Sequence, residues 1–243
     1  MGVIIFNGIS SKDYHIQVEH PPGYDTPERD YEMVHVPGRN GDLYIEKNSY
    51  QNTKRTYEIA ALVPKSTFTN IANGINEWLH SAVGYAVLED SYEPDYFRYA
   101  AYVEDGSITN ILEKGGRVTV SFNCKPQRFL KEGKKGIVIS SSNSKVYNPT
   151  KYEALPIVHV KITSNGVLNI NGCSMTIAKP GDKDALIINS DLQDCYDSTQ
   201  TLNLNKYVAF NNDKFPKLSP GNNDISYSGG IVGVTIYPNW WTL

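Results

Sequence analysis

Hydrophobic and polar residues alternate in short runs along most of this 243-residue chain, and clusters of Gly, Pro, Asn and Asp separate the runs. Within residues 117–124, Val118, Val120 and Phe122 alternate with polar residues, which is typical of a strand with one buried face. Further strand-like runs lie at residues 3–6, 14–19, 31–36, 54–63, 85–89, 96–104 and 107–112. The pattern predicts a mainly β chain.

One segment follows the period of a helix instead. Its hydrophobic residues recur at intervals of three and four positions, as one face of an α-helix requires. These residues are Phe68, Ile71, Ala72, Ile75, Trp78, Leu79 and Ala82. Ser66 is suited to cap the start of this helix and Gly84 to end it. We therefore expect a single long helix over residues 67–81, with its apolar stripe packed against the core rather than around a cofactor.

The second half of the chain has only strand patterns. Residues 157–163 alternate, and Asn165-Gly166 and Asn171-Gly172 follow at the positions of two turns. Because Asn-Gly between alternating runs is a strong hairpin signal, we expect a three-stranded meander over residues 157–178. With the later runs this gives about eight strands, which suits a sandwich of the galectin-like or jelly-roll type.

A stretch rich in Lys, Gly and Ser at residues 130–149 separates the two patterns. We place the domain boundary there. The predicted organisation is an N-terminal β-sandwich-like domain with a helix and a hairpin over residues 1–133, followed by a galectin-like β-sandwich over residues 134–243.

Charge narrows the choice of partners. The net charge is −3, and residues 1–130 carry 12 Lys and Arg against 17 Asp and Glu, a balance of −5. Such a chain lacks the basic surface of a nucleic-acid-binding protein. No run of about 18 apolar residues predicts a membrane span, and the first residues do not resemble a secretory signal. The three cysteines are widely spaced, which favours free thiols in a reducing cytoplasm.

We find no pattern of residues that predicts catalysis, a metal or a cofactor. The five histidines lack zinc-ligand spacing. The aspartates between Asp182 and Asp197 lack the spacing of a calcium loop and suit turns better. We interpret Glu89-Asp90, at a predicted strand end, as solvated charge rather than as a catalytic pair. Adjacent residues of a strand point to opposite sides, so for Trp240 and Trp241 we expect packing in the core or at a domain interface rather than a sugar platform.

Several longer motifs resemble the distal tail proteins of siphophages, the Dit-like family of phage tail components. Taken in order they cover nearly the whole chain. They are VPGRNGDLYIE at 36–46, VSFNCKPQRFL at 120–130, NPTKYEALPIVHV at 148–160, LIINSDLQDCYD at 186–197, FPKLSPGNNDISYSG at 215–229 and YPNWW at 237–241.

The resemblance implies a structural virion protein at the distal end of the tail, made in the cytoplasm of the bacterial host. In that family six N-terminal domains form a hexameric ring, and the galectin-like domains carry other baseplate components. The implied partners are further copies of the chain, the tail tube protein, the tape measure protein, the tail-associated tip protein and the receptor-binding protein. DNA would only pass through the lumen of the ring, and no membrane insertion is implied.

The turn at Pro37, Gly38, Arg39, Asn40 and Gly41 is the candidate subunit interface. An exposed turn on a rigid scaffold suits contact between subunits, and Arg39 could donate a charge-assisted hydrogen bond. The alternative is an ordinary hairpin loop. Two other functions remain open at this point: a carbohydrate-binding module that takes part in host adsorption, and a tail-associated hydrolase.

Overall fold

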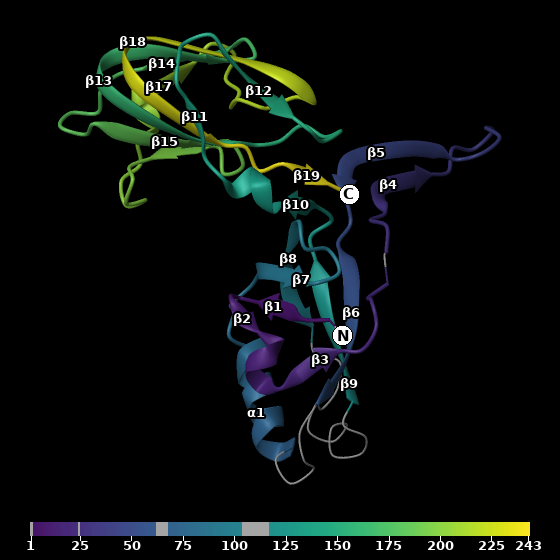
Figure 1. Cartoon of the computed structure of the whole chain (residues 1–243). Coiled ribbons are helices and arrows are strands. Elements are labelled where there is room, and N and C mark those ends of the chain that lie inside the picture. The colour runs from purple at the N-terminus through teal and green to yellow at the C-terminus, as the bar shows by residue number, and fades with distance from the viewer. Residues whose placement is uncertain (1, 24, 62–67, 104–116) are drawn as a thin grey trace. The chain divides into compact units, whose positions relative to one another are not determined.

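The computed structural model describes residues 2–23, 25–61, 68–103 and 117–243. It divides into two compact units, Met1–Arg128 with Leu243, and Phe129–Thr242. Strands dominate both units, and the described residues contain one α-helix (Figure 1). The mainly β fold with one helix is therefore confirmed. The strand expected at residues 107–112 and the helix cap expected at Ser66 lie outside the described residues.

The first unit is built on one antiparallel sheet with the strand order β2-β1-β7-β8-β9-β6-β3. The strands are β1 (Ile4–Phe6), β2 (Ile9–Ser10), β3 (Ile16–Val18), β6 (Thr53–Ala61), β7 (Ala86–Asp90), β8 (Tyr96–Val103) and β9 (Arg117–Cys124). The sheet curls until its ends meet, because Gly2 and Val18 exchange two backbone hydrogen bonds of 2.9 Å. Phe6, Tyr57 and Phe122 fill the enclosed side.

The helix α1 (Phe68–Leu79) packs on this core, as its periodicity predicted. Ala72, Ile75, Trp78 and Leu79 of the helix are buried. The indole nitrogen of Trp78 donates to the main-chain oxygen of Phe6 at 3.0 Å, which ties the helix to β1. The helix ends two residues before the expected position. A short 3-10 helix, η1 (Ser11–Tyr14), lies between β2 and β3.

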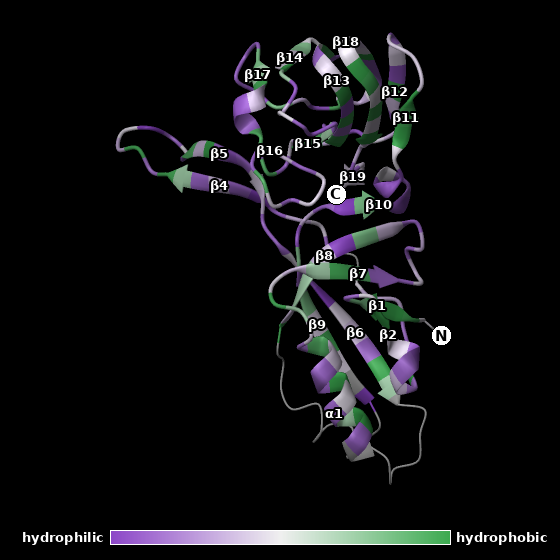
Figure 2. Cartoon of the chain, turned by 90° about the vertical axis from the view of Figure 1, so that its left-hand side faces the viewer, coloured by the Kyte–Doolittle hydropathy of each residue, from purple (hydrophilic) through white to green (hydrophobic). Residues whose placement is uncertain are grey.

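The second unit is an antiparallel sandwich whose main sheet runs β11-β18-β13-β14-β17. Its strands are β11 (Ile137–Ile139), β12 (Ser144–Asn148), β13 (Ile157–Ile170), β14 (Cys173–Ile177), β15 (Ala185–Asn189), β16 (Asp194–Tyr196), β17 (Val208–Phe210) and β18 (Gly221–Tyr237), with η4 (Asn205–Tyr207) before β17. Hydrophobic and hydrophilic residues alternate along β13 and β18 (Figure 2). Their inward side chains, among them Val160, Leu168 and Val234, form the core.

The prediction of a hairpin turn at Asn165-Gly166 is wrong. β13 runs without a turn from Ile157 to Ile170, and its register against β18 shifts between Ile162 and Gly166. A Cβ atom on Gly166 would lie 2.6 Å from the main-chain oxygen of Ser228, so the glycine serves a close approach of two strands. The turn at Asn171-Gly172 is confirmed, with φ values of 50° and 78° between β13 and β14.

The segment that we expected to link two domains is folded. Residues Lys131–Lys134 form the 3-10 helix η3, after β10 (Arg128–Leu130). β10 pairs with β19 (Trp241–Thr242). The compact units meet between Arg128 and Phe129. The domain boundary that the sequence predicts between residues 133 and 134 stays a prediction.

Candidate subunit interface

A two-stranded hairpin contains the candidate turn. Its strands are β4 (Arg29–Val34) and β5 (Leu43–Tyr50), which pair antiparallel and form a sheet of their own (Figure 1). The register places Met33 opposite Tyr44 and Val34 opposite Leu43. A lone two-stranded hairpin is only marginally stable in water, so it gains stability when another surface covers it.

The five candidate residues lie together in the loop between these strands. Pro37, Gly38, Arg39, Asn40 and Gly41 are all exposed. The Arg39 amide donates to the Val36 oxygen at 3.2 Å, and the two glycines have φ values of 83° and 78°. The exposed turn is thus as expected, while its role in subunit contact stays a prediction.

One face of the hairpin is aromatic. Tyr31, Met33 and Tyr44 are 48%, 53% and 49% exposed. The rings of Tyr31 and Tyr44 stack with their centroids 5.0 Å apart. Because cross-strand pairs share a face, Met33 and Tyr44 lie beside each other on this surface.

The opposite face is aliphatic. Leu43 and Ile45 are 37% and 42% exposed, and Val34 is half-buried next to Leu43. Side chains of one strand alternate between its two faces, so these residues point away from Tyr44. Exposed apolar patches are typical of surfaces that bind another protein. A hairpin with two apolar faces is suited to lie between two partners.

Polar side chains pair with one another at three places along the hairpin. Arg29 forms an ion pair with Glu46, Lys47 lies 3.7 Å from Asp30, and the His35 ring nitrogen lies 3.2 Å from the Asp42 carboxylate. Exposed pairs of this kind contribute about 0–1 kcal/mol each. They support the strand register but do not replace burial of the apolar faces.

Sequence analysis identified the turn but not the apolar strands that flank it. The signal was present as consecutive hydrophobic residues, Met33-Val34 in one strand and Leu43-Tyr44-Ile45 in the other. Consecutive hydrophobic residues in a strand place apolar groups on both faces. In a separate two-stranded sheet whose apolar side chains are exposed, this pattern indicates an interaction surface.

The residues that could suggest other chemistry have structural roles. Asp197 accepts hydrogen bonds from the amides of Thr201 and Leu202 at 3.0 and 3.1 Å, and a bond from Thr199 lowers its pKa, which fits a turn residue. Trp240 is 3% exposed within the core, as expected. The three cysteines are free and buried, and burial raises the pKa of Cys124 to about 11.

A possible metal cluster is weak. Carboxylate and imidazole atoms of Glu19, His20 and Glu58 lie within 4.8 Å of one another. Glu19, however, is 2.8 Å from the Arg117 guanidinium, and His20 and Glu58 are exposed. Arg117 thus already pairs with one of the two carboxylates of this cluster. Separately, none of the described helices has the length and apolar character needed to cross a membrane.

Two solved structures of phage proteins have folds similar to that of this chain. The whole chain is similar in fold to the whole of the SPP1 Dit protein (gp 19.1), with a TM-score of 0.71 and 13% sequence identity. That protein is described as a paradigm of the hub adsorption apparatus in phages that infect Gram-positive bacteria. A chain of the phage p2 baseplate in its activated conformation with Sr matches at a TM-score of 0.55 and 11% identity, over 97% of this chain and 96% of that one.

At the level of sequence, no protein-family model and no curated protein matches the chain. The expected resemblance to siphophage distal tail proteins is confirmed as a likeness of fold over the full length.

Proposed function

We propose that this chain is a structural protein of a phage or prophage tail tip, a distal tail protein without enzymatic activity. The observation that carries the proposal is the likeness of both units, end to end, to a phage hub protein. A chance match of one β-sandwich would cover only one unit. Six copies then form a hexameric ring that joins the tail tube to the tail-tip and receptor-binding proteins.

The hairpin β4–β5 is the arm through which copies contact one another. A ring needs a heterologous interface, in which one surface of each copy meets a different surface of the next. An arm with two apolar faces fits this requirement, because its faces differ and both are exposed. The turn at residues 37–41 then lies at the end of the arm and adds polar contacts.

The charge of the first half suits a ring that DNA crosses. Residues 1–130 have a balance of −5. A basic wall would hold DNA by releasing counterions, whereas an acidic wall leaves it free to pass. An image of the assembled ring in which the lumen wall carries more Lys and Arg than Asp and Glu would contradict this part of the proposal.

The interface is tested with the full chain and two hairpin substitutions. Met33→Asp with Ile45→Asp places a charge on each apolar face, so burial against another copy becomes unfavourable. Native mass spectrometry at rising protein concentration should show six-copy species for the wild type and only single copies for the double variant.

The matched control is Val138→Asp, at a position that is 72% exposed in β11 of the second unit. It should assemble as the wild type does. A wild-type chain that stays monomeric at every concentration, or a double variant that assembles normally, would count against the ring and the arm respectively.

A further inference from the structure

Asparagine stands directly before glycine at five places in the chain, at residues 7, 40, 73, 165 and 171. This pair is chemically reactive, because the main-chain nitrogen of a glycine can attack the preceding side-chain amide without hindrance from a Cβ atom. The attack needs a backbone that can move, a side chain that can rotate and a nitrogen that no hydrogen bond occupies. The fold therefore decides which of the five pairs reacts.

Two of the pairs are held within the first unit. Asn73 and Gly74 lie in the interior of α1, where the helix occupies the main-chain amides with hydrogen bonds. Asn7 and Gly8 form the turn between β1 and β2. The side-chain amide of Asn7 donates to the Ser81 hydroxyl at 3.2 Å, which fixes its direction.

Two more pairs are held within the second unit. Asn165 lies inside β13, and its Oδ1 accepts from the Lys179 amide at 2.9 Å. Asn171 lies between β13 and β14 and is bonded at both ends of its side chain. Its Oδ1 accepts from the Asp224 amide at 3.0 Å, and its Nδ2 donates to the Lys217 oxygen at 3.2 Å. Neither side chain can turn toward the following nitrogen without breaking these bonds.

The fifth pair, Asn40 and Gly41, lies in the loop that joins β4 to β5 at the end of the arm. Both residues are exposed. Within the part of the chain that the structure describes, the Asn40 side chain and the Gly41 amide have no hydrogen-bond partner. A Cβ atom at Gly41 would meet no atom within 4 Å, so the surroundings leave the attack unobstructed.

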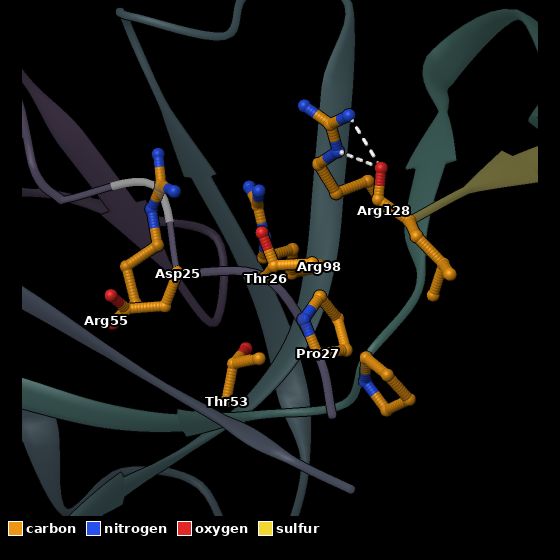
Figure 3. A pocket seen from close by; sticks show the side chains of 9 residues that line it. Asp25, Thr26, Pro27, Thr53, Arg55, Arg98 and Arg128 are labelled. Carbon is orange, nitrogen blue, oxygen red and sulfur yellow. Dashed lines mark hydrogen bonds between the residues drawn. The ribbon is translucent and has the colours of Figure 1, made fainter. Parts of the chain in front are cut away.

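The base of the arm is held, in contrast to this loop. The segments that lead into and out of the arm line one pocket together with the arginine cluster; they contribute Asp25, Thr26, Pro27 and Thr53, and the cluster consists of Arg55, Arg98 and Arg128 (Figure 3). Arg55 and Arg98 both donate to the buried Glu93 carboxylate, at 2.8 and 2.6 Å. The pair at the end of the arm has no bonds of this kind.

We propose that Asn40 is a site of spontaneous deamidation in the native chain. The Gly41 nitrogen loses its proton to a base in the solvent and bonds to Cγ of Asn40. The Cγ–Nδ2 bond breaks, and the nitrogen leaves as ammonia after it takes a proton from water. A second water molecule then opens the cyclic imide. Attack at Cγ gives aspartate, attack at the main-chain carbon gives isoaspartate, and nothing is oxidised or reduced.

Either product adds a negative charge beside Arg39 and close to Asp42. Isoaspartate also adds a carbon atom to the main chain, in a turn where Gly41 already has a φ of 78°. The reaction is a property of the free turn and does not rest on the proposed ring. Contact between copies through this turn would only slow it.

The test follows deamidation of the full chain at all five pairs by peptide mapping with mass spectrometry, natively and in concentrated urea. A residue held by hydrogen bonds reacts only after local opening, so Asn40 should react at least about tenfold faster than Asn165 and Asn171 in the native chain. This preference should disappear in urea. The rate at Asn40 should rise with pH, because the deprotonated nitrogen attacks.

Two variants separate the effect of the fold from that of the sequence. Ser81→Ala removes the hydroxyl that holds the Asn7 side chain, so deamidation should become faster at Asn7 and stay unchanged at Asn40. No gain at Asn7 would contradict the role given to the hydrogen bond. The matched control is Asn222→Gln, at an exposed residue of β18 that does not precede glycine, and it should alter neither rate.

Native rates at Asn165 or Asn171 that equal or exceed the rate at Asn40 would overturn the proposal. A rate at Asn40 that stays low at every protein concentration would do the same. A rate that rises on dilution supports the site and shows that other copies cover the turn. A fast rate that does not change on dilution supports the site and counts against contact between copies through the turn, so the two proposals fail separately.

Discussion

Glu93 retains a charge although its side chain is only 8% exposed. Burial alone would raise the pKa of this carboxyl, but hydrogen bonds from Arg98 and Arg128 outweigh burial and lower it. The same guanidiniums depend on Glu93 for their own compensation. Removing one member of a buried ionic group costs more than the group contributes as a whole, since the remaining charges lose their partner.

Glu93→Gln should therefore destabilise the first unit by about 3 kcal/mol at pH 7. The folded pKa lies below the unfolded value of about 4.3, so the stabilisation by Glu93 is present above that pH and is lost as pH falls through the folded pKa. Urea denaturation of both proteins should show a large difference at pH 7 that shrinks in acid. Glu28→Gln, at an exposed position, serves as control and should change little. An equal difference at both pH values would contradict the assigned charge.

The arginine cluster also shows which residue roles sequence can reveal. Asp90 was interpreted as solvated charge at a strand end, and this is wrong because it is 7% exposed. Its partner Arg55 is 35 positions away. No local pattern connects residues that meet only when the sheet curls. In contrast, alternation along a strand, a local property, predicted that Trp240 and Trp241 would not share one surface, and Trp240 is buried while Trp241 is partly exposed.

Among the elements, the two Asn-Gly pairs also show that a local pattern does not reveal pairing between distant segments. Both fit a hairpin turn by composition, yet only Asn171-Gly172 forms one. At Asn165-Gly166 the strand continues, because β18 offers pairing partners on both sides of the irregularity. Long-range pairing decides the outcome there. The helix α1 was predictable because its period of 3.6 residues is carried within twelve residues.

The two glycines should respond differently to substitution. Gly172 has a φ of 78° with no atom within 4 Å of a Cβ, so Gly172→Ala should cost about 1–2 kcal/mol from backbone strain. Gly172→Asn should cost less, because Asn tolerates this conformation. Gly166 lacks space instead, since its Cβ would meet a main-chain oxygen.

Gly166→Ala should therefore cost about 1–3 kcal/mol from overpacking, and Gly166→Asn should be worse than Ala rather than better. Urea denaturation of the four variants gives the order. Relief of Gly166 by Asn would show that conformation, not space, requires the glycine there.

At the scale of the whole molecule, composition predicted a domain boundary between residues 133 and 134, and the structure divides into compact units between Arg128 and Phe129. Lys131, Glu132 and Lys134 are polar residues typical of a linker. In the structure, however, the segment is tied to the end of the chain within the second unit. The Leu130 amide donates to the Trp240 oxygen at 2.8 Å, and the Asn239 amide donates to the Gly133 oxygen at 3.0 Å. A Cβ on Gly133 would lie 2.5 Å from the Trp240 nitrogen.

Two fragments of the second unit test how much this segment contributes. A fragment of residues 129–243 retains β10 and η3, whereas one of residues 136–243 leaves β19 and the Trp240 backbone without these partners. Each net hydrogen bond contributes about 1 kcal/mol, and Leu130 adds apolar contact with the core. The longer fragment should therefore unfold cooperatively with a thermal midpoint several degrees above that of the shorter one, as calorimetry can measure.

Equal midpoints would show that residues 129–135 are a linker after all, and would support a boundary between residues 133 and 134. A longer fragment that is unfolded would instead show that the sandwich needs the first unit in order to fold.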